Sequence, residues 1–177
     1  MRISPLLGFA ATLLTCVQPA IAQEMPSGYR LPTQIELADP DRAASPTRFA
    51  RAVADFNGDG VEDEAVLLKS TKYSGQALFI RLSDGNKGFR WVQLDSIDWG
   101  PKYPNVGLSM AIEVLKPGVH EYYCFDGEKA CDGDEPAKKK KLTLTKPGLS
   151  YYKFESSGSF FVWDAKTNKF LRAWNSE

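Results

Sequence analysis

Short apolar segments with the period of a β-strand, each followed by a turn signal, make up nearly all of this chain after residue 47. Alternate residues of a strand point to opposite faces, so a segment such as 108–114 can bury one face against a core. Helix has one candidate, residues 33–38, which are stopped by Pro40. The sequence therefore predicts a mainly β fold with little helix, in which antiparallel sheets built from hairpins form a sandwich or partial barrel.

Turn signals predict how these strands are joined. Residues 76–82 and 89–94 flank a Gly-rich turn, and residues 160–163 and 170–174 flank another turn near the end of the chain. Lys116-Pro117-Gly118 and Lys146-Pro147-Gly148 are each followed by an aromatic strand, which gives a repeat of about 30 residues. Two copies are too few for a solenoid, so we expect each Lys-Pro-Gly turn to close one of two neighbouring hairpins.

The beginning of the chain has the pattern of an export signal. Residues 1–22 contain one basic residue, an apolar stretch at 6–17 and a small-residue cleavage pattern before Gln23. Cys16 offers the alternative of a lipoprotein, although the small residue expected before a lipidated cysteine is missing. No later segment approaches the about 18 apolar residues of a membrane span. We therefore expect a signal peptide at 1–22, an irregular segment at 23–47, and one β domain at 48–177 that is periplasmic or secreted and has no transmembrane anchor.

Charge and cysteine content narrow the expected partners and the redox state. The chain has 22 basic and 22 acidic side chains, and this balance does not favour nucleic acid. In an exported protein, Cys124 and Cys131 are expected to form a disulfide that pins an acidic loop. A metal or redox pair is disfavoured, since the spacing is not Cys-x-x-Cys and His120 is the only histidine.

Residues 55–63 carry oxygen donors at alternate positions of one tight loop. Hard divalent cations bind six to eight oxygens, and Gly60 permits the positive φ that closes such a loop. The flanking residues 49–54 and 64–69 have strand character, so the loop joins two strands. Positions 1, 3, 5 and 9 of the loop offer side-chain oxygens, from Asp55, Asn57, Asp59 and Asp63. Position 7, Val61, offers its backbone carbonyl.

Over residues 52–68 this pattern resembles the calcium loop of FG-GAP and VCBS-type repeats, as in the propeller blades of integrin α-subunits. The resemblance implies that these five residues bind Ca²⁺, which would hold the flanking strands in register. Propeller blades recur every 50 to 60 residues, whereas this loop occurs once, so only the ion site is carried over. The alternative is an acidic turn held by Asx-type hydrogen bonds without an ion. A second ion site at Asp126, Asp132 and Asp134 is a further open question.

The sequence lacks the common motifs of catalysis. The chain has no Gly-x-Ser-x-Gly, no His-Glu-x-x-His and no phosphate-binding or dinucleotide-binding loop. We therefore expect a calcium-stabilised protein without enzymatic activity that binds a protein or glycan of the cell envelope, in its concrete form an inhibitor or immunity protein against an envelope-acting hydrolase. Two alternatives stay open: an enzyme that acts on envelope polysaccharide through loop carboxylates, and a glycan-binding module.

Aromatic residues are the candidate contacts for a partner. Trp99 and Tyr103 lie in a proline-rich loop, where they can stack on a sugar ring or anchor a protein. Strand aromatics such as Trp91, Phe161 and Trp163 are expected to pack in the core instead.

Overall fold

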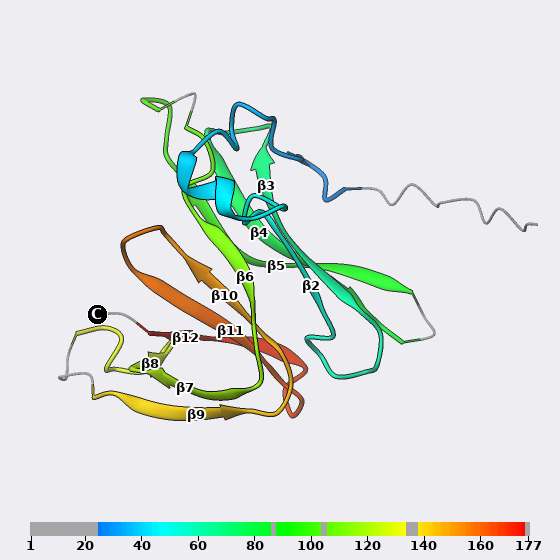
Figure 1. Ribbon diagram of the computed structural model, residues 1–177, viewed down its shortest axis with the longest axis vertical. Helices are drawn as coiled ribbons and strands as arrows, with labels where there is room; N and C mark the ends of the chain where they lie inside the picture. Colours follow the sequence, from blue (N-terminus) through cyan, green and yellow to red (C-terminus); the bar gives the residue numbers. More distant parts are fainter. Residues whose placement is uncertain (1–24, 86–87, 104–105, 134–137, 176–177) are drawn as a thin grey trace, which may run out of the picture.

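The computed structural model describes residues 25–85, 88–103, 106–133 and 138–175. The predicted signal peptide and Cys16 lie outside these ranges. The chain forms two five-stranded sheets and a two-stranded ribbon, all antiparallel (Figure 1). The mainly β fold with little helix is therefore confirmed.

The first sheet has the strand order β1-β3-β4-β5, and β2 pairs with the same edge of β3 as β1 does. Its strands are β1 (Tyr29–Arg30), β2 (Arg51–Ala54), β3 (Asp63–Ser70), β4 (Gly75–Ser83) and β5 (Phe89–Asp98). The second sheet has the order β6-β10-β11-β12-β8. Its strands are β6 (Ala111–Leu115), β8 (Cys124–Phe125), β10 (Gly148–Tyr152), β11 (Gly158–Asp164) and β12 (Lys169–Trp174). The ribbon pairs β7 (Gly118–Tyr122) with β9 (Lys140–Leu144).

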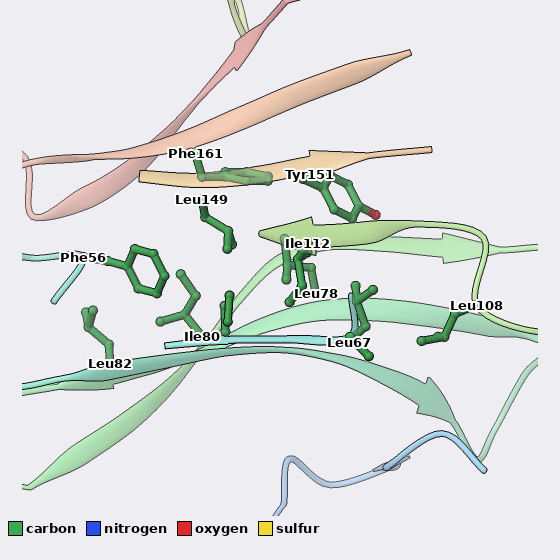
Figure 2. Packing of buried hydrophobic residues seen from close by; sticks show 13 residues of the cluster. Phe56, Leu67, Leu78, Ile80, Leu82, Leu108, Ile112, Leu149, Tyr151 and Phe161 are labelled. Carbon is green, nitrogen blue, oxygen red and sulfur yellow. The ribbon is translucent and has the colours of Figure 1, made fainter. Parts of the chain in front are cut away.

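The two sheets stack around the main core. The first sheet contributes side chains from alternate positions of β3 and β4, and the second contributes side chains from β6, β10 and β11; they include Leu67, Leu78, Ile80, Leu82, Ile112, Leu149 and Phe161 (Figure 2). Phe56, from the loop between β2 and β3, is fully buried in the same cluster. The loop is therefore anchored to the core at its second residue.

Both sheets also bury part of their outer faces. On the first sheet Val66, Leu68 and Phe79 form a second cluster, against which Tyr29 and Trp91 pack. On the second sheet Phe160 and Val162 belong to a third cluster, against which Tyr122, Leu142 and Leu144 of the ribbon pack. The ribbon strands β7 and β9 lie beside this sheet in Figure 1. Strands buried on both faces have continuous apolar runs instead of strict alternation, as β11 does.

The local hairpins match the prediction. β2 pairs with β3, β4 with β5, and β11 with β12, each across the expected turn. A helix over residues 33–38 is not formed, because this segment makes a single turn closed by the Leu37 amide on the Thr33 carbonyl at 3.1 Å. The helical segment is instead a short 3₁₀ helix, η1 (Pro40–Ala44).

The two Lys-Pro-Gly turns do not close hairpins, and this part of the prediction is wrong. β6 continues through one turn into β7, and β9 continues through the other into β10, while β6 pairs with β10 and β7 with β9. The pairs Leu115↔Gly148 and Gly118↔Leu144 place the two turns opposite each other. Proline lacks the N–H that a sheet ladder needs, so each long strand bends there and passes from the second sheet into the ribbon.

The segment before β2 is tied down by one buried arginine. Arg42, on η1, is fully buried and donates its guanidinium N–H groups to the carbonyls of Arg48, Leu108 and Met110. These bonds reach across to the chain just before β6, so the N-terminal segment is an integral part of the domain.

Candidate binding groove and acidic loop

The acidic loop, residues 55–63, connects β2 to β3 and is flanked by strands as predicted. Asp55 accepts the backbone N–H groups of Gly58, Asp59 and Gly60 at 2.6, 3.1 and 2.9 Å. Both glycines have positive φ, at 80° and 86°, which brings these amides round onto one carboxylate. The first residue of the loop therefore organises its tip.

Asp63 joins the loop to the end of β4. Its carboxylate is fully buried and accepts the amides of Phe56 at 2.9 Å, Asn57 at 3.2 Å and Ser83 at 2.7 Å. Burial raises the pKa of Asp63, and the three N–H donors oppose this shift. The ninth residue of the loop is thus a buried connection between two parts of the backbone.

Asp59 and Asn57 complete the closure of the loop. Asp59 accepts the Ser83 hydroxyl, which is the largest cause of its lowered pKa, and the Val61 amide at 2.8 Å. The Asn57 side-chain amide donates to the Ser83 carbonyl at 3.1 Å. Lys146, from the second Lys-Pro-Gly turn, donates its ammonium to the Asn57 carbonyl at 2.8 Å.

These contacts bear on the predicted ligand set. Among the described residues, no group of three or more His, Cys, Asp or Glu side chains is placed to hold a metal ion. The carboxylates of Asp55, Asp59 and Asp63 instead accept N–H and O–H donors of the protein. Calcium binding therefore stays a prediction from the sequence pattern.

A groove opens beside the acidic loop, between β5 of the first sheet and β12 of the second. It consists of two adjoining cavities of about 510 and 560 Å³, which share Arg90, Trp163 and Asn168 in their walls. The more apolar cavity, of about 510 Å³, is lined by Val92, Leu94, Phe161, Trp163, Phe170 and Leu171. The polar end is lined by the acidic loop and the end of β4, including Asn57, Asp59, Ser83 and Asp84.

Both strands that border the groove have free edges. Within the described chain, β5 pairs with β4 and with no strand on its other side. β12 pairs with β11; on its other edge β8 covers Ala173 and Trp174, and the Arg172 carbonyl accepts the Asp126 amide at 3.0 Å, which leaves the edge open at residues 169–171 within the described chain. On the β5 side, Arg90 and Val92 pair with Leu82 and Ile80, whose side chains belong to the main core. Arg90 and Val92 accordingly point into the groove.

The charged residues of the groove differ in how far they are neutralised. Arg172 lies 3.6 Å from the Asp95 carboxylate, donates to the Ser159 hydroxyl at 2.9 Å and stacks on Trp174 at 4.0 Å. Arg90 and Lys169 form no ion pair with any carboxylate in the described part of the chain. The groove therefore carries two cations that are available to a ligand.

The disulfide predicted between Cys124 and Cys131 is confirmed, with the two Cα atoms 5.6 Å apart. It closes residues 124–131, and Phe125 of β8 and Asp126 form one end of the groove. Asp126 accepts the indole N–H of Trp174 at 2.5 Å, so it is tied to β12. Asp132 is described, whereas Asp134 lies outside the described residues, and the second ion site has no further support.

The loop aromatics do not belong to the groove. Tyr103 is 59% exposed and Trp99 is half-buried, and neither is among the residues that line it. Phe161 is core, as predicted, while Trp163 is half-buried and faces the groove. His120 has its Nε2 2.8 Å from the Lys116 carbonyl and packs near Phe160.

Sequence reasoning missed Arg90, Trp163 and Lys169 as candidate site residues. Arg90 comes from the β4–β5 hairpin, whereas Trp163 and Lys169 come from the β11–β12 hairpin, and only the stacking of the two sheets brings them to one groove. No spacing in the sequence predicts that meeting.

Comparison with known proteins adds no relative. No protein-family model, no curated protein and no solved structure matches the chain. The similarity to FG-GAP repeats thus rests on the pattern of the acidic loop alone. Within the described ranges, no helix is long and apolar enough to cross a membrane.

Proposed function

We propose that this chain is an exported, non-enzymatic binding protein that holds a segment of a protein partner in the groove between β5 and β12. The observation that carries the proposal is the groove itself, which combines an apolar wall, two unpaired cations and a free strand edge. Clefts with an apolar lining and few polar groups are the usual sites of ligand binding. Free strand edges favour another polypeptide over a sugar, because backbone N–H and C=O groups recognise an extended backbone.

The concrete form of this proposal is an inhibitor or immunity protein that blocks an envelope-acting hydrolase. The export pattern of residues 1–22 and the Cys124–Cys131 disulfide support action outside the cytoplasm. An inhibitor needs a rigid surface so that little conformational entropy is lost on binding. The disulfide and the Asp126–Trp174 hydrogen bond hold one end of the groove in this way.

Calcium binding by the acidic loop is part of the same proposal. One support is the placement of oxygen ligands at positions 1, 3, 5, 7 and 9 of the loop. The other is that each carboxylate oxygen has two lone pairs, so it can accept a hydrogen bond and still have a lone pair for an ion. In the described state these oxygens accept protein donors, so an ion would bind only if some of these contacts rearrange. The ion would strengthen the loop at the polar end of the groove.

Site-specific photo-crosslinking in the producing cell tests the binding surface. Benzoyl-phenylalanine placed at Gln93 is expected to trap one protein partner, because this exposed residue lies at the open edge of β5, with its side chain on the same outer face as Phe79 and within reach of a segment bound along that edge. The matched control is Val119, which is 61% exposed on the ribbon and is not among the residues that line the groove. The trapped protein is then identified by mass spectrometry and assayed for inhibition by the purified chain.

Three results would contradict the proposal. Equal adducts from Gln93 and Val119 would mean unspecific contact. A third variant carries the probe at Tyr103, and adducts from this variant alone would move the binding surface to the proline-rich loop. Turnover of peptidoglycan by the purified chain would make it an enzyme.

A further inference from the structure

We infer that the partner segment binds as an extra β-strand along the first half of β5 and presents an acidic side chain to Arg90 and Lys169. This inference rests on the proposed function and specifies how the groove recognises its partner. It commits to one occupant, an extended segment of another protein with a carboxylate at an inward-facing position.

The backbone of β5 has one unpaired edge. β5 is paired on one side only, so alternate residues direct their N–H and C=O groups to the open side. An added strand would lie about 4.8 Å away, and every second side chain of it would point toward the second sheet. On that side lies the groove, with Phe161, Trp163 and Phe170 in its wall.

A β-bulge limits where the extra strand can pair. The register between β4 and β5 shifts between Leu78 and Phe79, which leaves Leu94 without a partner on β4. A bulge interrupts the ladder and twists the strand, so an uninterrupted partner strand pairs with residues 89–93. This half of β5 contains Arg90, Val92 and Gln93, which line the groove, and it spans about 17 Å at the usual rise per residue.

The charges of the groove specify the inward-facing side chains of the partner. Arg172 is already paired with Asp95, whereas Arg90 and Lys169 have no described carboxylate partner. A carboxylate beside them would gain charge-assisted hydrogen bonds in a partly dry site. Asp59 and Asp84 make the far end of the groove acidic and would repel a second carboxylate there. The charge pattern therefore favours one acidic residue, next to apolar ones.

A second copy of this chain is the competing occupant. Pairing of two β5 strands edge to edge would bring both Arg90 side chains to the same face of the joint sheet and would supply no carboxylate from β5 at that point. The charge pattern is thus complementary to an acidic segment and not to a second copy of the same strand.

A peptide titration followed by ¹⁵N NMR tests this inference on the full mature chain. The probe is an acetylated seven-residue peptide in which valine and threonine alternate around a central aspartate. We expect chemical-shift changes at residues 89–94 and at Lys169–Trp174. Replacing the aspartate by lysine should weaken binding at least 10-fold, and Arg90→Glu should reverse that preference. Arg90→Lys is the control that keeps the charge.

Two N-methylated peptides separate strand addition from other binding in the groove. In an added strand, neighbouring amides point in opposite directions, so methylation at one of two adjacent residues should weaken binding at least 10-fold and methylation at the other less than 3-fold. Equal effects at both residues would overturn strand addition while leaving the groove, and the proposed function, in place. Shifts at 89–94 that depend on protein concentration without peptide would assign the edge to a second copy and overturn the inference. Absence of any peptide-induced shift, with a Gln93 crosslink still formed in cells, would also overturn the strand mode alone.

Discussion

Replacing Asp63 by asparagine should destabilise the domain by about 2–3 kcal/mol, even without calcium. Asp63 accepts three backbone N–H groups, and an amide of the same shape must turn its NH₂ toward one or two of them. A lost, buried N–H bond costs about 1–3 kcal/mol, and the remaining bonds weaken by roughly 0.5–1 kcal/mol each when the acceptor is neutral. Relief of the buried charge, whose desolvation raises the pKa of Asp63, offsets part of this cost.

Urea unfolding of the mature chain in excess chelator measures this cost. The expected midpoint falls while the slope m stays constant, and the melting temperature should fall by about 4–12 °C for a domain of this size. Glu62→Gln is the matched control, since Glu62 is exposed and adjacent, and it should change stability by less than about 0.5 kcal/mol. A cost below about 0.5 kcal/mol for Asp63→Asn would refute the view that this carboxylate connects the loop to β4.

Three further outcomes are expected. Calorimetric melting in calcium at about 100 times its Kd should show a stabilisation of about 2.7 kcal/mol that is absent in chelator and in Asp59→Ala; identical melts would leave the loop a turn without an ion. Arg30, through its hydrogen bonds, lowers the pKa of Glu36 to about 2. Because this is below the unfolded value, the pair stabilises the fold above about pH 4.5 and that stabilisation is lost as the pH falls toward 2. The free energy of unfolding should therefore fall less steeply between about pH 4.5 and 2 in Glu36→Gln than in the unchanged chain. Because Arg30 is partly exposed, the two curves should differ by no more than about 1 kcal/mol, and parallel curves would argue against the pair. Replacing Cys124 and Cys131 by alanine should cost about 2.5 kcal/mol in urea unfolding, from the loop entropy of a ring this small; an unchanged midpoint would contradict that model.

Local turn chemistry explains which parts of the fold could be predicted. The β11–β12 hairpin and the loop between β2 and β3 have their strands next to each other in the sequence, and the turn residues between them mark the reversal. The Lys-Pro-Gly turns carry an equally clear signal for a bend, but a bend does not say whether the chain reverses. Their pairing, β6 with β10 and β7 with β9, is decided by packing between segments about 30 residues apart.

The sequence predicted those parts of the candidate site whose residues are close together in the chain. The oxygen donors of the acidic loop are consecutive in sequence and were found directly, whereas the contribution of Ser83 and Lys146 to its closure comes from other strands and turns. The groove is a property of the open side of the sandwich. Arg90 and Lys169 come to line one groove only after two separate hairpins have stacked.

Hydrogen–deuterium exchange of the chain alone and in complex with the partner trapped at Gln93 decides whether the groove is the binding surface. Binding should slow exchange at residues 89–93 of β5 and at the neighbouring part of β12, Lys169–Arg172, while the ribbon strands β7 and β9 exchange as before. Slower exchange confined to the ribbon, or to the loop around Trp99 and Tyr103, would contradict the assignment of the groove as the binding surface.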